Sequence, residues 1–115
     1  MTDGYVPDRG DVVWLNFDPQ SGREQAGHRP ALVLSPASYN GRIGLMIVCP
    51  ITSKIKGYPF EVPVLGNPDV AGVILADHVK SVDWRSRRAK KKGEAPARVV
   101  QQVIGKLQAL LNPAL

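Results

Sequence analysis

Apolar and polar residues alternate along several short stretches, and this alternation predicts strands. The stretch from Asp11 to Asp18 has an apolar residue at every second position, as expected of a strand with one face directed inward. The inward positions there are Val13, Leu15 and Phe17. Four more stretches are rich in Val, Ile or Leu and bounded by Gly, Pro or Asn, which predicts further strands. They run from Ala31 to Ser35, Leu45 to Ile51, Pro59 to Val64 and Val73 to Val82.

The C-terminal part changes to a helical period. Apolar residues recur there at steps of three and four, Pro96 suits a first helical position, and Asn112 with Pro113 ends the pattern. The apolar stripe comprises Val100, Val103, Ile104, Leu107, Leu110 and Leu111. We therefore expect a mainly β fold, a small SH3-like barrel of five or six strands, with one C-terminal helix covering an end or face of the barrel.

Length and composition agree with one globular domain over residues 1–115. The chain is 43% hydrophobic, which is enough for a core of ordinary density. Its one cysteine, Cys49, excludes an internal disulfide, and the N-terminus shows no secretory pattern, so we expect a cytoplasmic protein. The longest apolar stretch, near Leu45 to Ile51, is too short for a membrane span.

Positive charge is concentrated in one segment. The chain has a net charge of +5 from 15 Lys and Arg against 10 Asp and Glu. Six of the 15 lie between Arg85 and Lys92, so the remainder of the chain is nearly neutral. We expect this run to form a long exposed loop. A local cationic patch favours a polyanionic partner, either a nucleic acid or an acidic protein segment, although it can also be a plain solvated surface.

Two further segments carry polar side chains that the fold does not obviously need. One is the end of the polar stretch from Pro19 to Arg29, which we expect to be a mobile loop and which has the sequence EQAGHR from Glu24 onward. The other, from Pro50 to Phe60, contains two aliphatic hydroxyls and two ammonium groups.

Five stretches together resemble the MazF/PemK (Kid) toxins of bacterial toxin–antitoxin pairs. They are YVPDRG (5–10), DVVWLNFDP (11–19), EQAGHRPALVLSP (24–36), KGYPFEV (56–62) and ADHVKS (76–81). The resemblance implies a homodimeric endoribonuclease that cuts single-stranded RNA at a short sequence. It also implies cleavage without a metal or cofactor, 2′,3′-cyclic phosphate and 5′-hydroxyl ends, and inhibition by an antitoxin with an acidic, partly disordered segment.

The resemblance places the catalytic Arg and Thr of the family at Arg29 and Thr52. Cleavage of this kind needs a group that takes the ribose 2′-proton, a group that protonates the departing 5′-oxygen, and a donor that stabilises the phosphoryl charge. A guanidinium suits the last two roles, but its pKa is too high for it to act as a base. We therefore expect Glu24 or His28 to accept the proton, with Thr52 bonding a phosphate oxygen.

Structural roles compete with these assignments. Arg29 can pair with a carboxylate at a strand entrance, Thr52 can form a turn, and His28 can serve as a structural hydrogen-bonding residue. Trp14 and Phe17 are expected to pack in the core or at its rim rather than to stack on bases.

His78 departs from the family, which often has Gln there. It puts base preference in doubt, because an imidazole presents its hydrogen-bonding groups in a different plane from an amide and can become charged near pH 6.5. A pair formed by His28 and His78, acting as acid and base, is an alternative mechanism. The residues expected to bind RNA are Lys56, His78, Lys80, Arg85, Arg87 and Arg88.

Two alternatives keep the same fold but remove the cleavage. One is an inhibitor of DNA gyrase like the CcdB proteins, which typically end in Trp-Gly-Ile, whereas this chain ends in LNPAL. The other is a catalytically inactive RNA-binding or autoregulatory module, which would bind RNA without forming product.

Overall fold

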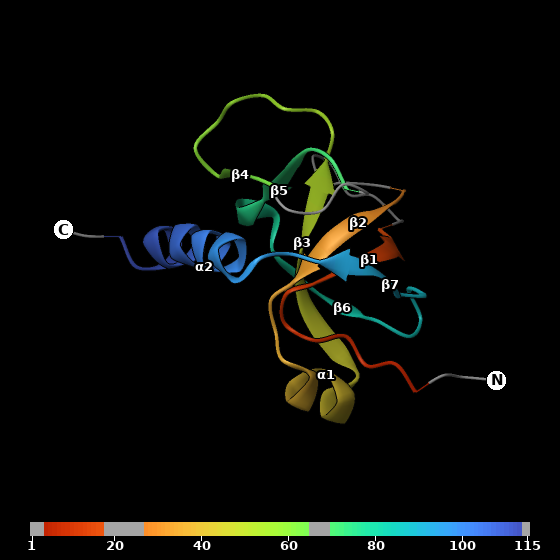
Figure 1. The fold of residues 1–115 in the computed structure, drawn as a ribbon. Coiled ribbons are helices and arrows are strands. Elements are labelled where there is room, and N and C mark those ends of the chain that lie inside the picture. Colours follow the sequence, from red (N-terminus) through yellow and green to blue (C-terminus); the bar gives the residue numbers. More distant parts are fainter. Residues whose placement is uncertain (1–3, 18–26, 65–69, 114–115) are drawn as a thin grey trace.

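The computed structural model describes residues 4–17, 27–64 and 70–113 and shows a group of strands with one long C-terminal helix that extends to one side of them (Figure 1). The mainly β class with a C-terminal helix is confirmed. The elements are β1 (Asp11–Asn16), β2 (His28–Val33), α1 (Ala37–Ile43), β3 (Leu45–Thr52), β4 (Glu61–Pro63), β5 (Val73–Leu75), the short 3-10 helix η1 (Ala76–His78), β6 (Lys80–Asp83), β7 (Lys90–Glu94) and α2 (Ala97–Leu111).

The strands form an antiparallel sheet in the order β4-β5-β3-β2-β1-β7. Besides β2, strand β3 pairs with two other strands. Its residues Leu45 to Val48 pair with β6, and its residues Ile51 and Thr52 pair with β5. Among the described strands no pairing joins β4 to β7, so the sheet is not closed in this part of the chain, and the expected SH3-like barrel stays a prediction.

Alternation along the strands separates two hydrophobic clusters, one on each face of the sheet. Val12 and Leu32 belong to the first cluster, which α2 covers through its buried residues. Val13 and Val33 belong to the second cluster, together with Phe17. We call these faces the helix face and the open face. This division decides which side of the sheet each polar side chain near the strand ends can reach.

The predicted C-terminal helix is confirmed with nearly the expected bounds. Pro96 stands just before it, at the N-cap, and Asn112 is the C-cap. Its buried residues are Val99, Val100, Val103 and Leu107. Leu110 and Leu111 were expected on the buried stripe but are 45% and 77% exposed, because the helix extends beyond the sheet (Figure 1). In the described part of the chain, no helix is both long and apolar enough to cross a membrane.

Two elements were not expected from the sequence. Helix α1 is fixed by tertiary contacts of Asn40, whose side chain is fully buried and donates to the carbonyl oxygens of Pro7, at 2.7 Å, and Ser35, at 2.9 Å. Strand β7 consists largely of lysines but pairs with the edge of β1, where Lys91 also contacts the Asp11 carboxylate at 3.5 Å. The predicted strand from Val73 to Val82 is interrupted by η1.

Candidate functional site

Arg29 and Thr52 lie near the same end of two neighbouring strands. Strands β2 and β3 pair in a register that sets Ala31 opposite Pro50 and Val33 opposite Val48. The paired residues end at Ala31 and Pro50, and extending this register by two residues would set Arg29 opposite Thr52. Alternation then directs both side chains to the open face, the side of Val33 and Val48. Thr52 is only 8% exposed, and Arg29 is half-buried.

A second cation is close to this end of the sheet. Lys80 pairs with Val48 across β3 and β6, and its Nζ lies 5.9 Å from the centroid of the Phe17 ring. Phe17 is buried in the open-face cluster, so it forms an apolar support for the lysine. We call Phe17, Arg29, Thr52 and Lys80 the cationic end of the sheet. It combines a guanidinium, an ammonium and a hydroxyl, which are groups that bind phosphate.

The backbone of Thr52 is positioned by Gly72. Gly72 has φ +118°, and a Cβ at this position would lie 2.1 Å from the carbonyl oxygen of Thr52. Only glycine permits such a close approach of the two chains. The Thr52 hydroxyl oxygen also accepts the backbone N–H of Lys54 at 3.1 Å. Nothing in the local sequence around Gly72 predicts this contact.

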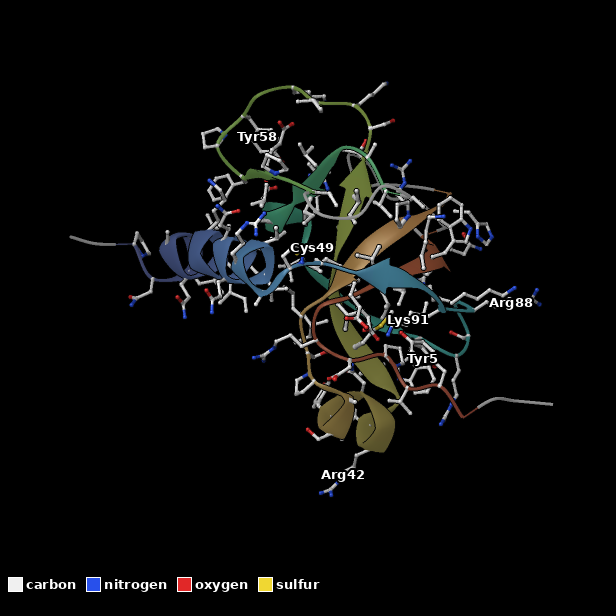
Figure 2. All side chains as sticks on the ribbon, viewed as in Figure 1. Tyr5, Arg42, Cys49, Tyr58, Arg88 and Lys91 are labelled. Atoms are coloured by element: carbon white, nitrogen blue, oxygen red, sulfur yellow. The ribbon has the colours of Figure 1, made fainter. Side chains whose placement is uncertain are left out.

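The segment that follows Thr52, residues 53–60, is held at several points. The Glu61 carboxylate accepts the backbone N–H groups of Lys56, at 2.9 Å, and Gly57, at 2.8 Å. The Tyr58 hydroxyl donates to the Asp77 carboxylate at 2.5 Å and so connects this segment, seen at the top of Figure 2, to η1. Burial, followed by the hydrogen bond to Asp77, raises the pKa of Tyr58 and keeps its hydroxyl protonated. Lys56 therefore stands exposed on a restrained segment.

Not all of the other candidate site residues lie at the cationic end. Glu24 lies outside the described residues. His28 alternates with Arg29, and its ring stacks on Trp14 with 6.5 Å between centroids and 29° between planes. This contact places His28 on the sheet side opposite Arg29. His78 lies in η1, half-buried, directly after Asp77. Phe17 is buried in the core, and Trp14, which is 39% exposed, lies at its rim, so both positions agree with the packing expected of them.

The run from Arg85 to Lys92 is not one exposed loop, as we had expected. It divides into a turn over residues 84–88 and strand β7. Arg85 lies 4.6 Å from the Trp84 ring, and the Arg87 guanidinium donates to the carbonyl oxygen of Asn16 at 3.2 Å. Figure 2 shows Arg88 directed outward, while Lys91 lies near Tyr5.

Lys91 is exposed, as Lys90 and Lys92 are, and it contacts two carboxylates. It contacts Glu94 at 2.8 Å and Asp11 at 3.5 Å. The hydrogen bond to Glu94 and the charge of Asp11 raise the pKa of Lys91. The basic patch is therefore less uniform than we expected from the sequence, because the charge of Lys91 is neutralised within the protein by Asp11 and Glu94.

No metal centre is evident in the described ranges 4–17, 27–64 and 70–113. They contain no group of three or more His, Cys, Asp or Glu side chains placed to hold an ion.

Comparison with known proteins gives a consistent result along nearly the whole chain. Residues 8–111 match the family of PemK-like, MazF-like toxins of type II toxin–antitoxin systems. The endoribonuclease toxin MazF of Escherichia coli K12 is 50% identical over 112 residues, covering 97% of this chain and 100% of that protein. The endoribonuclease toxin ChpB of the same organism is 41% identical over 112 residues, covering 91% and 94%.

Solved structures agree with this result. A crystal structure of MazF from Deinococcus radiodurans superposes with a TM-score of 0.90 at 64% identity, covering 93% of this chain and 97% of that one. A MazE–MazF crystal structure from the same organism gives a TM-score of 0.84 at 57% identity, covering 96% and 99%. On the family match and these identities, the chain belongs to the PemK-like, MazF-like toxins of type II toxin–antitoxin systems.

Proposed function

We propose that this protein is an endoribonuclease toxin that is neutralised by a cognate antitoxin. The E. coli relatives are named endoribonucleases, and the D. radiodurans relative has been crystallised with MazE. The observation that supports the proposal is the β2–β3 register, which, extended by two residues, would direct Arg29 and Thr52 to one face at one end of the sheet. The gyrase-inhibitor alternative lacks comparable support, because these relatives act on RNA by name.

The proposed reaction is an in-line attack of a ribose 2′-oxygen on the adjacent phosphorus, without a metal. The bond from O2′ to phosphorus forms while the bond from phosphorus to O5′ breaks, which leaves a 2′,3′-cyclic phosphate and a 5′-hydroxyl. Arg29 stabilises the charge on the phosphoryl oxygens and donates the proton that O5′ acquires. The Thr52 hydroxyl donates to a non-bridging phosphate oxygen.

We assign the removal of the 2′-proton to Glu24. Of the two candidates, His28 stacks on Trp14 and lies on the other side of the sheet from Arg29. That placement argues against His28 as the base and equally against a catalytic pair of His28 with His78. A Glu24→Gln variant that cleaves RNA at the parent rate would overturn this assignment.

The test of the proposed reaction is the chemistry of the new RNA ends. Purified protein is incubated with a long single-stranded transcript in EDTA, and the products are mapped by primer extension. We expect cuts at one short sequence, 5′ ends that accept phosphate from polynucleotide kinase without prior dephosphorylation, and 3′ ends that can be ligated or extended only after the cyclic phosphate is opened and removed. Ends bearing 5′-phosphate, or cleavage only with added divalent cations, would contradict the proposal.

We propose that the RNA follows a cationic track from the cationic end along exposed basic residues. Lys56, His78 and Lys80 would lie near the scissile phosphate, and Arg85, Arg87 and Arg88 would extend the track, which would run between two subunits of a homodimer. An antitoxin segment that is acidic and partly disordered would compete for the same surface. Sedimentation at micromolar concentration tests the dimer, and displacement of RNA by the antitoxin tests the competition.

The salt dependence of RNA binding should distinguish Arg88, which we propose to contact RNA, from Lys91, which we do not. If about four phosphates are neutralised, single-strand affinity falls with a log-log salt slope near −3. Arg88→Ala should make this slope less steep by roughly 0.7, because one phosphate contact is lost. Lys91→Ala is the matched control and should leave the slope unchanged, since Lys91 faces Asp11 and Glu94. Equal slopes for all three proteins would remove Arg88 from the binding surface.

The hydrogen bond between Tyr58 and Asp77 should affect turnover. We expect Tyr58→Phe to lower kcat about tenfold, because the segment after Thr52 loses its connection to η1 and a small displacement from the reacting geometry is costly. Stability should fall by about 1 kcal/mol. Tyr39→Phe on α1 is the matched control. Unchanged kcat in Tyr58→Phe, measured in single-turnover cleavage, would show that the bond is not needed for catalysis.

A further inference from the structure

Trp14 stands at the uncovered end of the helix face. It follows Val12 by two residues on β1, so both side chains lie on the side that α2 covers. Val12 is fully buried under this helix, whereas Trp14 is 39% exposed. The sheet therefore presents a large aromatic ring to solvent next to a segment with catalytic candidates.

Two cationic or ionisable neighbours surround this ring. His28, from the adjacent strand β2, stacks on it with 6.5 Å between centroids and an interplanar angle of 29°. Lys92, from β7 on the other side, places its Nζ 5.5 Å from the ring centroid. Three strands thus contribute one side chain each to a single surface, which we call the Trp14 platform, consisting of Trp14, His28 and Lys92.

This combination matches what a single-stranded nucleic acid requires. Proteins bind unpaired strands by stacking bases on aromatic rings while cationic side chains follow the phosphates. The Trp14 indole is held in a fixed orientation because the His28 ring supports it. Lys92 can contact the phosphate of a nucleotide whose base stacks on the indole. An acidic peptide would use Lys92 but would gain little from the two stacked rings.

The platform and Arg29 lie at the same end of the sheet but on opposite sides. Trp14 pairs with Pro30, which follows Arg29 in the chain, and consecutive side chains of a strand leave the sheet on opposite sides. An RNA strand must therefore pass around this end of the sheet to place its scissile phosphate at Arg29 and another of its bases on Trp14. The platform then binds a nucleotide away from the reacting linkage.

We propose that the Trp14 platform is a subsite that binds one unpaired RNA base by stacking, outside the group of residues that performs the cleavage. This inference rests on the proposed endoribonuclease function. It predicts that Trp14 contributes to RNA affinity and that any planar aromatic residue at position 14 retains much of this contribution.

Binding is measured with a 2′-O-methyl RNA oligonucleotide that contains the mapped cut sequence. This probe has no free 2′-hydroxyl to attack the phosphate, so affinity is separated from cleavage. We expect Trp14→Leu to weaken binding at least tenfold and Trp14→Phe to weaken it less than threefold. RNA should also quench the tryptophan fluorescence of the parent protein, because Trp84 is buried and Trp14 is the exposed indole. The quench should be lost in Trp14→Phe.

Tyr39→Leu is the matched control, because Tyr39 is 37% exposed but lies on α1, at the far end of the molecule from the N-terminal end of β2 (Figure 1). It should bind the oligonucleotide as the parent does. Parent-like affinity in a folded Trp14→Leu protein would overturn the subsite, even if that variant binds the antitoxin less tightly. Failure of the parent to bind or cut any RNA would instead overturn the proposed function, so the two failures are distinguishable.

Discussion

Replacing Arg29 by alanine should lower the rate of RNA cleavage by roughly a thousandfold while RNA affinity changes little. The reason is that the guanidinium is proposed to act on charge that develops only in the transition state, whereas ground-state affinity is spread over several cations. The cleavage rate is measured with saturating enzyme in a single turnover, and affinity is measured with the 2′-O-methyl oligonucleotide.

Two further variants test whether the loss of cleavage in Arg29→Ala depends on the position of the positive charge and on the shape of the guanidinium. Arg29→Lys keeps a positive charge but not the planar, two-pronged donor, so we expect only partial activity. Arg42→Ala removes an exposed arginine from α1, distant from the sheet end in Figure 2, and should cleave at the parent rate. Cleavage by Arg29→Ala within threefold of the parent would refute the catalytic assignment.

Replacing Gly72 by alanine should destabilise the protein by about 3 kcal/mol and remove most of the cleavage activity. The added Cβ would lie 2.1 Å from the Thr52 carbonyl oxygen, which is backbone and cannot turn aside. Either β5 or the end of β3 must move, and the second movement displaces the Thr52 hydroxyl. Chemical denaturation gives the loss in free energy of unfolding, and cleavage is measured well below the midpoint.

Gly44→Ala separates backbone strain from the steric contact. Gly44 also has a positive φ, +85°, but no atom lies within 4 Å of the Cβ that alanine would add. We expect about 1 kcal/mol of destabilisation and parent-like cleavage. If Gly72→Ala were no worse than Gly44→Ala in either measurement, the close approach to Thr52 would be unimportant.

The elements predicted correctly are those whose burial pattern is visible locally. The N-terminal strand and the C-terminal helix each bury a regular apolar face, so period two and period 3.6 identify them. Helix α1 is short and depends on hydrogen bonds of buried Asn40 to Pro7, which is distant in sequence. Strand β7 forms because β1 has a free edge for it, and a run of lysines gives no sign of that pairing.

The candidate site shows the same division between local and nonlocal information. Arg29 and Thr52 were found through motifs, since their neighbours in the sequence match the family. Their common face follows from the β2–β3 register, and a register is a relation between two strands that neither segment specifies alone. The contact of Gly72 with Thr52 and the stacking of His28 on Trp14 are likewise long-range relations.

Strand β2 also limits how the toxin can be altered. Because His28 and Arg29 leave the sheet on opposite sides, a slip of β2 by a single residue would send the imidazole to the open face and the guanidinium to the helix face. The segment between β1 and β2 can therefore change in length only if β2 keeps its phase. In a chimera that exchanges this segment between relatives, we expect cleavage activity to alternate with the number of residues by which β2 is shifted, with odd shifts inactive.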